Sequence, residues 1–176
     1  MNYTELCTNI NNLPEPNFLM TERFNEFDTS SLHFLEPLIS LLEKHNLSNG
    51  SYIDLFCGKG DVLKKIKSSF TSTEMLGINT IAYDVWSDDT IKFYNKDVSQ
   101  VLKLEPYKFD VTMMFNIHES IWPSRPSVPK DNFISWCKSN TKFLVTNGKP
   151  KTKISNMELV DSVSPRKQKY NINLYK

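Results

Sequence analysis

A short loop between a predicted strand and a predicted helix carries the residues with the clearest chemical use. The chain has only five glycines, and two of them, Gly58 and Gly60, follow the apolar run at residues 52–56. Glycine at such a turn permits a positive φ and lets the backbone approach a ligand closely. The free N–H groups at the start of the next helix face the same crevice. The spacing therefore predicts a ligand site at the end of the strand, although an ordinary strand-to-helix turn is the simpler alternative.

Two acidic residues favour a ligand that carries a ribose. Asp54 lies on the strand itself, and Asp84 follows Gly60 by 24 residues, close to the interval of ~20 residues at which an acid meets a ribose diol. A carboxylate suits that task because it accepts hydrogen bonds from both hydroxyl groups at once. The third glycine of a G-x-G-x-x-G motif is absent because Leu63 stands in its place. This disfavours a dinucleotide-binding oxidoreductase.

Strand and helix signals alternate along the chain with short connections. Thr29, Ser30 and Ser31 offer a helix start, and apolar residues recur at helical spacing from Leu32 to Leu42. This helix should end near Asn46, although Pro37 favours a later start near Glu36. A second helix begins at Asp61. Further elements are predicted by the apolar runs: strands at residues 52–56, 78–85, 91–94, 109–115 and 142–146, a helix at 131–139, and an antiparallel hairpin of residues 157–163 and 170–175.

This pattern predicts an α/β three-layer sandwich with a mainly parallel sheet and a C-terminal antiparallel hairpin. Residues 1–30 are polar and contain Pro14 and Pro16, so we expect an irregular N-terminal arm there. Residues 31–176 then form a single domain, in keeping with the chain length of 176 residues.

Composition excludes several classes of protein. The chain is 39% hydrophobic with a net charge of +1, which excludes a disordered tail. It contains no apolar run of ~18 residues and no basic, apolar signal start, so we expect a cytoplasmic protein with no membrane partner. The cysteines Cys7, Cys57 and Cys137 are scattered and indicate neither a disulfide framework nor a metal site.

Charge is distributed unevenly along the chain. Residues 1–119 hold 10 basic and 17 acidic side chains, whereas residues 120–176 hold 11 basic and 3 acidic ones. Such asymmetry is typical of a surface for a polyanion, usually RNA or DNA. The alternative is a set of solvated lysines, as an AT-rich genome would encode.

The run D-L-F-C-G-K-G at residues 54–60 resembles the first motif of class I S-adenosylmethionine (SAM)-dependent methyltransferases, which have a Rossmann-like fold. Residues 81–85 look like the family's second strand, with Asp84 in the ribose-binding place. Residues 95–98 are similar to the third motif, whose acid, here Asp97, reaches the adenine amino group. The resemblance implies that SAM is the cofactor and that it contacts Asp54, Phe56, Cys57, Gly58, Lys59, Gly60, Asp84, Val85, Asp97, Val98 and Asn116.

The chain departs from this family at one position of the first motif. Phe56 stands where the family has its first glycine. Several branches that methylate nucleic acids tolerate this substitution.

Residues 108–116 look like the family's fourth strand, which ends beside the transferred methyl group. Candidates for catalysis follow directly: Asn116, the base His118 and Glu119, which would orient it. His118 as an ordinary loop histidine is an equal alternative. No Pro-Cys nucleophile, no (Asp/Asn)-Pro-Pro-aromatic tetrapeptide and no Lys-Asp-Lys-Glu tetrad is visible, so the subfamily stays open.

Candidates for substrate binding lie in two later loops. In the proline-rich segment 122–129, Trp122 is suited to stacking on a base and Arg125 to contacting a phosphate. Lys149, Lys151 and Lys153 would steer an anion. A rigid connector with a core tryptophan and solvated lysines is the alternative.

We therefore expect a SAM-dependent methyltransferase that acts on a nucleic-acid or nucleotide-containing acceptor. A small-molecule or protein methyltransferase and a catalytically inactive binding protein of the same fold remain alternatives. The small size leaves room for a partner subunit or a homodimer in substrate selection.

Overall fold

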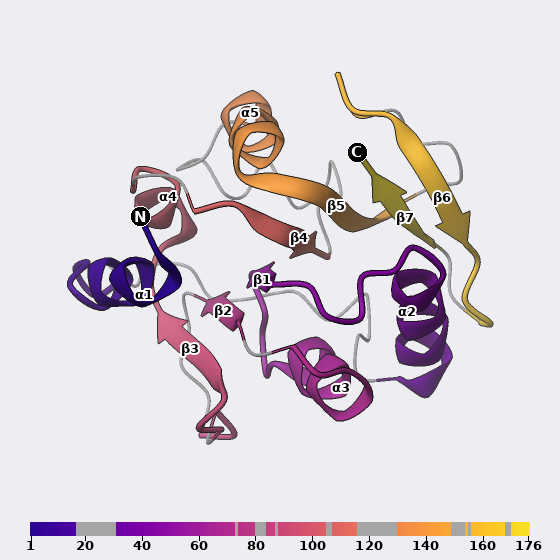
Figure 1. The fold of residues 1–176 in the computed structure, drawn as a ribbon, viewed down its shortest axis with the longest axis horizontal. Helices are drawn as coiled ribbons and strands as arrows, with labels where there is room; N and C mark the ends of the chain where they lie inside the picture. The colour runs from indigo at the N-terminus through magenta and orange to yellow at the C-terminus, as the bar shows by residue number, and fades with distance from the viewer. Residues whose placement is uncertain are drawn as a thin grey trace.

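The computed structural model describes residues 1–16, 31–72, 74–79, 84–86, 88–104, 107–115, 130–148, 154, 156–167 and 170–176. Seven strands form one sheet in the order β3-β2-β1-β4-β5-β7-β6 (Figure 1). The strands are β1 (Tyr52–Leu55), β2 (Met75–Asn79), β3 (Ile91–Asn95), β4 (Phe109–Met114), β5 (Thr141–Gly148), β6 (Leu159–Val163) and β7 (Asn171–Tyr175). The helices are α1 (Tyr3–Asn11), α2 (Leu32–Lys44), α3 (Asp61–Ser69), α4 (Val98–Val101) and α5 (Lys130–Asn140).

The sheet is parallel except at its C-terminal end. β1 pairs in parallel with β2 and β4, β2 with β3, and β4 with β5. β7 is antiparallel to both β5 and β6. This confirms the predicted α/β fold class and the closing hairpin. The chain winds outward from β1 to β3 and then returns to the other side of β1 with β4. Ligands of such sheets bind at this reversal, outside the carboxyl ends of the strands.

Helices cover both faces of the sheet, as the apolar strands require (Figure 1). On one face, α2 and α3 bury side chains such as Phe34 and Leu63 against Val111 of β4. On the other face, α1, α4 and α5 bury side chains such as Ile10 and Phe133. The protein is therefore a three-layer sandwich with a separate apolar core on each face of the sheet.

The first residues differ from the prediction of an irregular arm at residues 1–30. Residues 3–11 form the helix α1, whose start carries a capping box: Asn2 accepts from the backbone of Glu5, and Glu5 accepts from the backbone of Asn2. Leu6 and Ile10 are buried in the core beneath this helix. The prediction was wrong here because the signal was overlooked: Tyr3, Leu6, Cys7 and Ile10 recur at helical spacing and pack against this core. Residues 17–30 lie outside the described part of the chain.

The helix α2 begins earlier than Pro37 suggested. It starts at Leu32, with the Ser31 side chain accepting from the backbone N–H of His33. Pro37 lies inside the helix, although it can donate no hydrogen bond to the preceding turn. The start near Glu36 is therefore wrong. Phe34 in the first turn is fully buried, which favours the earlier start.

The second strand also lies elsewhere than predicted. β2 spans Met75–Asn79 instead of residues 78–85, and all five of its residues are buried. Its central residue, Gly77, leaves room for the ring of Phe93 on β3, which would lie 2.6 Å from an added Cβ atom. Residues 80–83 lie outside the described part, and Asp84 and Val85 form a turn. The pairing with β1 and β3 selected the earlier apolar run.

An ion pair and a hydrogen-bond contact fasten the C-terminal hairpin to the end of α2 and to the His45 that follows it. Asp161 on β6 accepts from Lys44 at 2.7 Å and lies 2.8 Å from the Nε2 atom of His45. These contacts hold the pKa of Asp161 at about 2, below its ordinary value. Within the residues described, no helix is both long and apolar enough to cross a membrane.

Candidate functional site

The loop that follows β1 has a left-handed backbone at three of its five residues. The φ angles are +67° at Phe56, +54° at Gly58 and +80° at Gly60. Glycine adopts this region freely, as the sequence led us to expect for Gly58 and Gly60. Phe56 adopts it at a cost of about 1–2 kcal/mol. Phe56 thus has a backbone conformation typical of glycine, at the position where the family motif has a glycine.

Hydrogen bonds tie this loop to the neighbouring segments. The backbone N–H of Cys57 donates to the carbonyl of Ile78 at 3.0 Å, and that of Gly60 donates to the carbonyl of Cys57 at 2.9 Å. The indole N–H of Trp86 donates to the carbonyl of Gly58, also at 2.9 Å. The loop is therefore fixed both to β2 and to the segment that follows β2.

The two loop glycines have different surroundings. A Cβ atom added at Gly60 would lie 2.5 Å from the ring of Phe93, so that ring and the φ of +80° both oppose a side chain there. A Cβ atom at Gly58 would meet no atom of the described residues within 4 Å. Gly58 therefore borders open space, which is the space that a ligand would use.

Asp54 is the buried acid of the site. It lies one residue before the end of β1, in register with Gly77 and Met113 on the neighbouring strands. The residue is only 2% exposed, and burial raises the pKa of its carboxyl group well above the ordinary value. No other residue that the structure describes hydrogen-bonds to its side chain. A buried ionised carboxylate is costly unless it is paired, so a cationic group bound beside it would be stabilised.

The end of β2 carries an amide instead of the expected acid. Asn79 is the last residue of the strand and is 3% exposed, and its carbonyl accepts from the backbone of Lys96. Asp84 lies five residues later in an exposed turn, next to the exposed Val85. We did not predict a role for Asn79 from the sequence. The available signal was the apolar run from Met75 ending in a polar residue.

Asp97 follows β3, beside the end of β2. Asn95, the last residue of β3, pairs with Asn79. The Asp97 side chain accepts from the backbone N–H of Ser99 at 2.8 Å and so caps the short helix α4. Val98 is the first residue of that helix and is buried. Asn79 and Asp97 thus stand at neighbouring strand ends on the carboxyl edge of the sheet.

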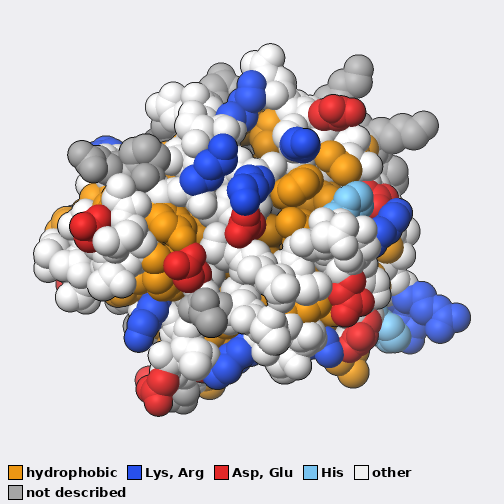
Figure 2. Space-filling view, in the orientation of Figure 1, with side chains coloured by type: hydrophobic (Ala, Val, Ile, Leu, Met, Phe, Trp, Pro, Cys, Tyr) orange, Lys and Arg blue, Asp and Glu red, His pale blue; other side chains and the backbone are white. Residues whose placement is uncertain are grey.

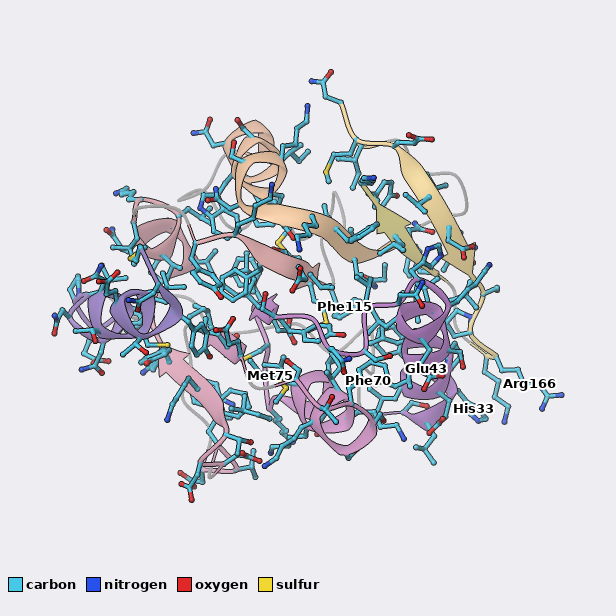
Figure 3. All side chains as sticks on the ribbon, viewed as in Figure 1. His33, Glu43, Phe70, Met75, Phe115 and Arg166 are labelled. Atoms are coloured by element: carbon cyan, nitrogen blue, oxygen red, sulfur yellow. The ribbon has the colours of Figure 1, made fainter. Side chains whose placement is uncertain are left out.

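The carboxyl edge continues with β4. Phe115 follows this strand and packs edge-to-face on Phe34 of α2, with 5.1 Å between the ring centroids. Figure 3 shows Phe115 between the end of β4 and α2. The remaining candidate residues lie outside the described part of the chain: Asn116, His118, Glu119, Trp122, Arg125 and Lys149. Their roles remain predictions.

Taken together, strand order and loop geometry define the Rossmann-like fold of class I SAM-dependent methyltransferases, as the sequence motifs suggested. A candidate methyltransferase from Escherichia coli is 11% identical, with 80% of this chain and 81% of that chain aligned at a TM-score of 0.61. A candidate RNA methyltransferase from Pyrococcus horikoshii is 13% identical, with 99% and 95% aligned at a TM-score of 0.58.

A third similar structure contains bound SAM. It is magnesium protoporphyrin IX methyltransferase from Synechocystis PCC 6803 with bound SAM, 12% identical, with 89% of this chain and 84% of that chain aligned at a TM-score of 0.54. No family profile matches the chain, and no curated protein matches its sequence. At these identities the similarity establishes the fold, and the subfamily is unassigned.

The left-handed backbone at Phe56 predicts that a glycine variant at this position is more stable than an alanine variant. We expect Phe56→Gly to be more stable than Phe56→Ala by about 1 kcal/mol, because both lose the ring but only alanine keeps a Cβ atom in the left-handed region. Urea denaturation measures the difference. The same pair at Ser40, exposed within α2, is the control. There alanine should be the more stable by about 1 kcal/mol. Equal stability of the two variants at residue 56 would contradict the proposal that the backbone is strained there.

Proposed function

We propose that this chain is a SAM-dependent methyltransferase acting on a nucleic-acid or nucleotide-containing acceptor. The main support for SAM as the cofactor is the carboxyl group of Asp54. It is buried at the sheet's reversal point, with no hydrogen bond to another described residue, beside a glycine that faces open space. SAM carries both an ammonium and a sulfonium group, and such cations would compensate this acid.

The other strand ends supply groups for the rest of the cofactor. Asn79 stands at the end of β2, the place of the ribose-binding acid, and we assign the diol to it in preference to Asp84. Its amide oxygen would accept from one hydroxyl group, and its NH2 group would donate to the other. Asp97 would accept from the adenine amino group, with Val98 beside the ring. Phe56, Cys57, Lys59, Gly60, Val85 and Asn116 remain proposed contacts from the resemblance.

Bound SAM supplies an activated methyl group, and the protein's task is then to align an acceptor atom with it. Such alignment alone contributes several kcal/mol. His118 would remove a proton from the acceptor where one must leave, Glu119 would orient His118, and Asn116 would line the end of β4. A variant without His118 would then slow transfer and leave cofactor affinity unchanged.

Support for a nucleic-acid acceptor comes from the charge pattern and from one structural neighbour. The C-terminal third holds 11 basic and 3 acidic residues, and the similar Pyrococcus horikoshii structure is described as an RNA methyltransferase. Trp122, Arg125 and Lys149 are the proposed contacts, through stacking and phosphate binding. A partner subunit or a second copy would complete substrate selection. A small-molecule or protein acceptor and an inactive binding protein are the competing functions.

Cofactor binding is tested first at Gly58. We expect Gly58→Val to lower the affinity for S-adenosylhomocysteine at least tenfold, because the side chain would enter the open space beside the loop and would strain its left-handed backbone. Calorimetric titration measures the affinity. Ser40→Val, on the exposed face of α2, is the control and should bind as the wild type does. A Gly58→Val protein with wild-type affinity would remove the loop from the site.

The ribose assignment is tested by comparing two residues. We expect Asn79→Ala to weaken S-adenosylhomocysteine binding about tenfold and Asp84→Ala to change it less than twofold, because only Asn79 ends a strand. Asn79→Asp should retain binding, since a carboxylate accepts from both hydroxyl groups. The same titration with adenine in place of the nucleoside should not distinguish these variants. The reverse order of effects would return the role to Asp84.

The acceptor is found by labelling. The protein is incubated with methyl-labelled SAM and, in separate reactions, with RNA, DNA and protein from cell extract. We expect label in a nucleic-acid fraction, with transfer that declines steeply as salt rises, because phosphate contacts release counterions. Label in protein or small molecules would support a methyltransferase with a small-molecule or protein acceptor. Binding of SAM without any transfer would support a catalytically inactive binding protein.

A further inference from the structure

An aromatic pair supports the glycine loop from the side of β3. The rings of Trp86 and Phe93 are stacked, with 5.4 Å between their centroids and 8° between their planes. Trp86 follows the exposed turn at Asp84 and Val85, and Phe93 lies in the middle of β3. Neither residue carries any function in the sequence motifs.

Phe93 holds this pair against the loop. An added Cβ atom would lie 2.5 Å from its ring at Gly60 and 2.6 Å from it at Gly77. The ring therefore occupies space that two glycines leave free, one at the start of α3 and one within β2. Because β2 and the helix start confine it on both sides, Phe93 is a fixed platform for the indole of Trp86.

The indole in turn fixes one peptide group of the loop. The Nε1 atom of Trp86 donates to the carbonyl of Gly58 at 2.9 Å. A peptide group is planar and trans, so the N–H of Lys59 must point to the opposite side from that carbonyl. This N–H makes no hydrogen bond to any residue that the structure describes. Lys59 itself is exposed, and Gly58 borders open space.

We propose that Trp86 is a positioning residue of the cofactor site. Its indole ring stacks on Phe93, and its N–H sets the orientation of the peptide between Gly58 and Lys59 before a ligand binds. The Lys59 N–H then faces the polar end of the ligand. The identity of that ligand rests on the proposed function, whereas the orientation of the peptide does not. A loop ordered in advance lowers the entropy cost of binding.

The first test compares two tryptophans. Trp86→Phe retains an aromatic ring for the stack but removes the donor. Trp136→Phe is the matched control, since Trp136 lies on α5 and packs into the core on the opposite face of the sheet. In the ligand-free protein, the 15N order parameter of Lys59 should fall from the rigid value of ~0.85 toward ~0.6 in Trp86→Phe only. Affinity for S-adenosylhomocysteine should fall by roughly 3–10-fold, as for the loss of one hydrogen bond.

A second variant covers the case in which Trp86→Phe does not fold. The chain has three tryptophans, so Trp122→Phe/Trp136→Phe leaves only Trp86, which is then replaced by benzothienylalanine. This residue keeps the bicyclic ring and lacks the N–H group. The same loss of order at Lys59 is expected.

The outcomes separate the two proposals. A wild-type protein that does not bind S-adenosylhomocysteine defeats the proposed cofactor, while the order parameter of Lys59 still decides the role of Trp86. An unchanged order parameter at Lys59 in the donor-free variants overturns the positioning role, whatever the affinity. Reduced order together with full affinity overturns it as well, because the peptide orientation would then not serve binding.

Discussion

The constraint on which the site depends is the left-handed backbone between Phe56 and Gly60. Three positive φ angles within five residues turn the chain sharply from β1 into α3. The turn exposes one edge of Gly58 and buries Asp54 one residue before the strand ends. An unfolded chain rarely populates such a conformation, because Phe56 resists it. The surrounding contacts must therefore supply the free energy that holds it.

Those contacts come from segments far apart in the sequence. The carbonyl of Ile78 on β2 accepts from Cys57, the indole of Trp86 donates to Gly58, and the ring of Phe93 packs beneath Gly60. None of them forms unless β2 and β3 lie beside β1 in the register observed. The loop is thus a consequence of the parallel sheet. Its glycines permit the shape, and the neighbouring strands select it.

This difference between local signals and contacts from distant segments explains what could be predicted from the sequence. β1, the glycine loop and β4 were predicted because their signals are local: short apolar runs and a pair of glycines. β2 was misplaced because residues 81–85 also carry apolar side chains, and it is pairing with β1 and β3 that selects residues 75–79. Gly77 was the overlooked signal, since a glycine inside a strand often marks the close approach of another group, here the ring of Phe93. The misplaced strand then placed Asp84, instead of Asn79, at the predicted end of β2.

The distribution of charged side chains along the sequence also differs from their distribution in the folded protein. In the described residues, two ion pairs link the acidic first part of the chain to the basic last part, because the fold places their elements side by side. Lys142 of β5 pairs with Asp110 of β4, and Asp161 of β6 pairs with Lys44 of α2. On the face drawn in Figure 2, basic and acidic side chains lie interspersed. Basic residues that are neutralised in this way contribute little attraction beyond a Debye length of ~10 Å. The proposed recognition of a polyanion would therefore depend on basic side chains that have no acidic partner in the fold, and on their distance from the carboxyl edge of the sheet.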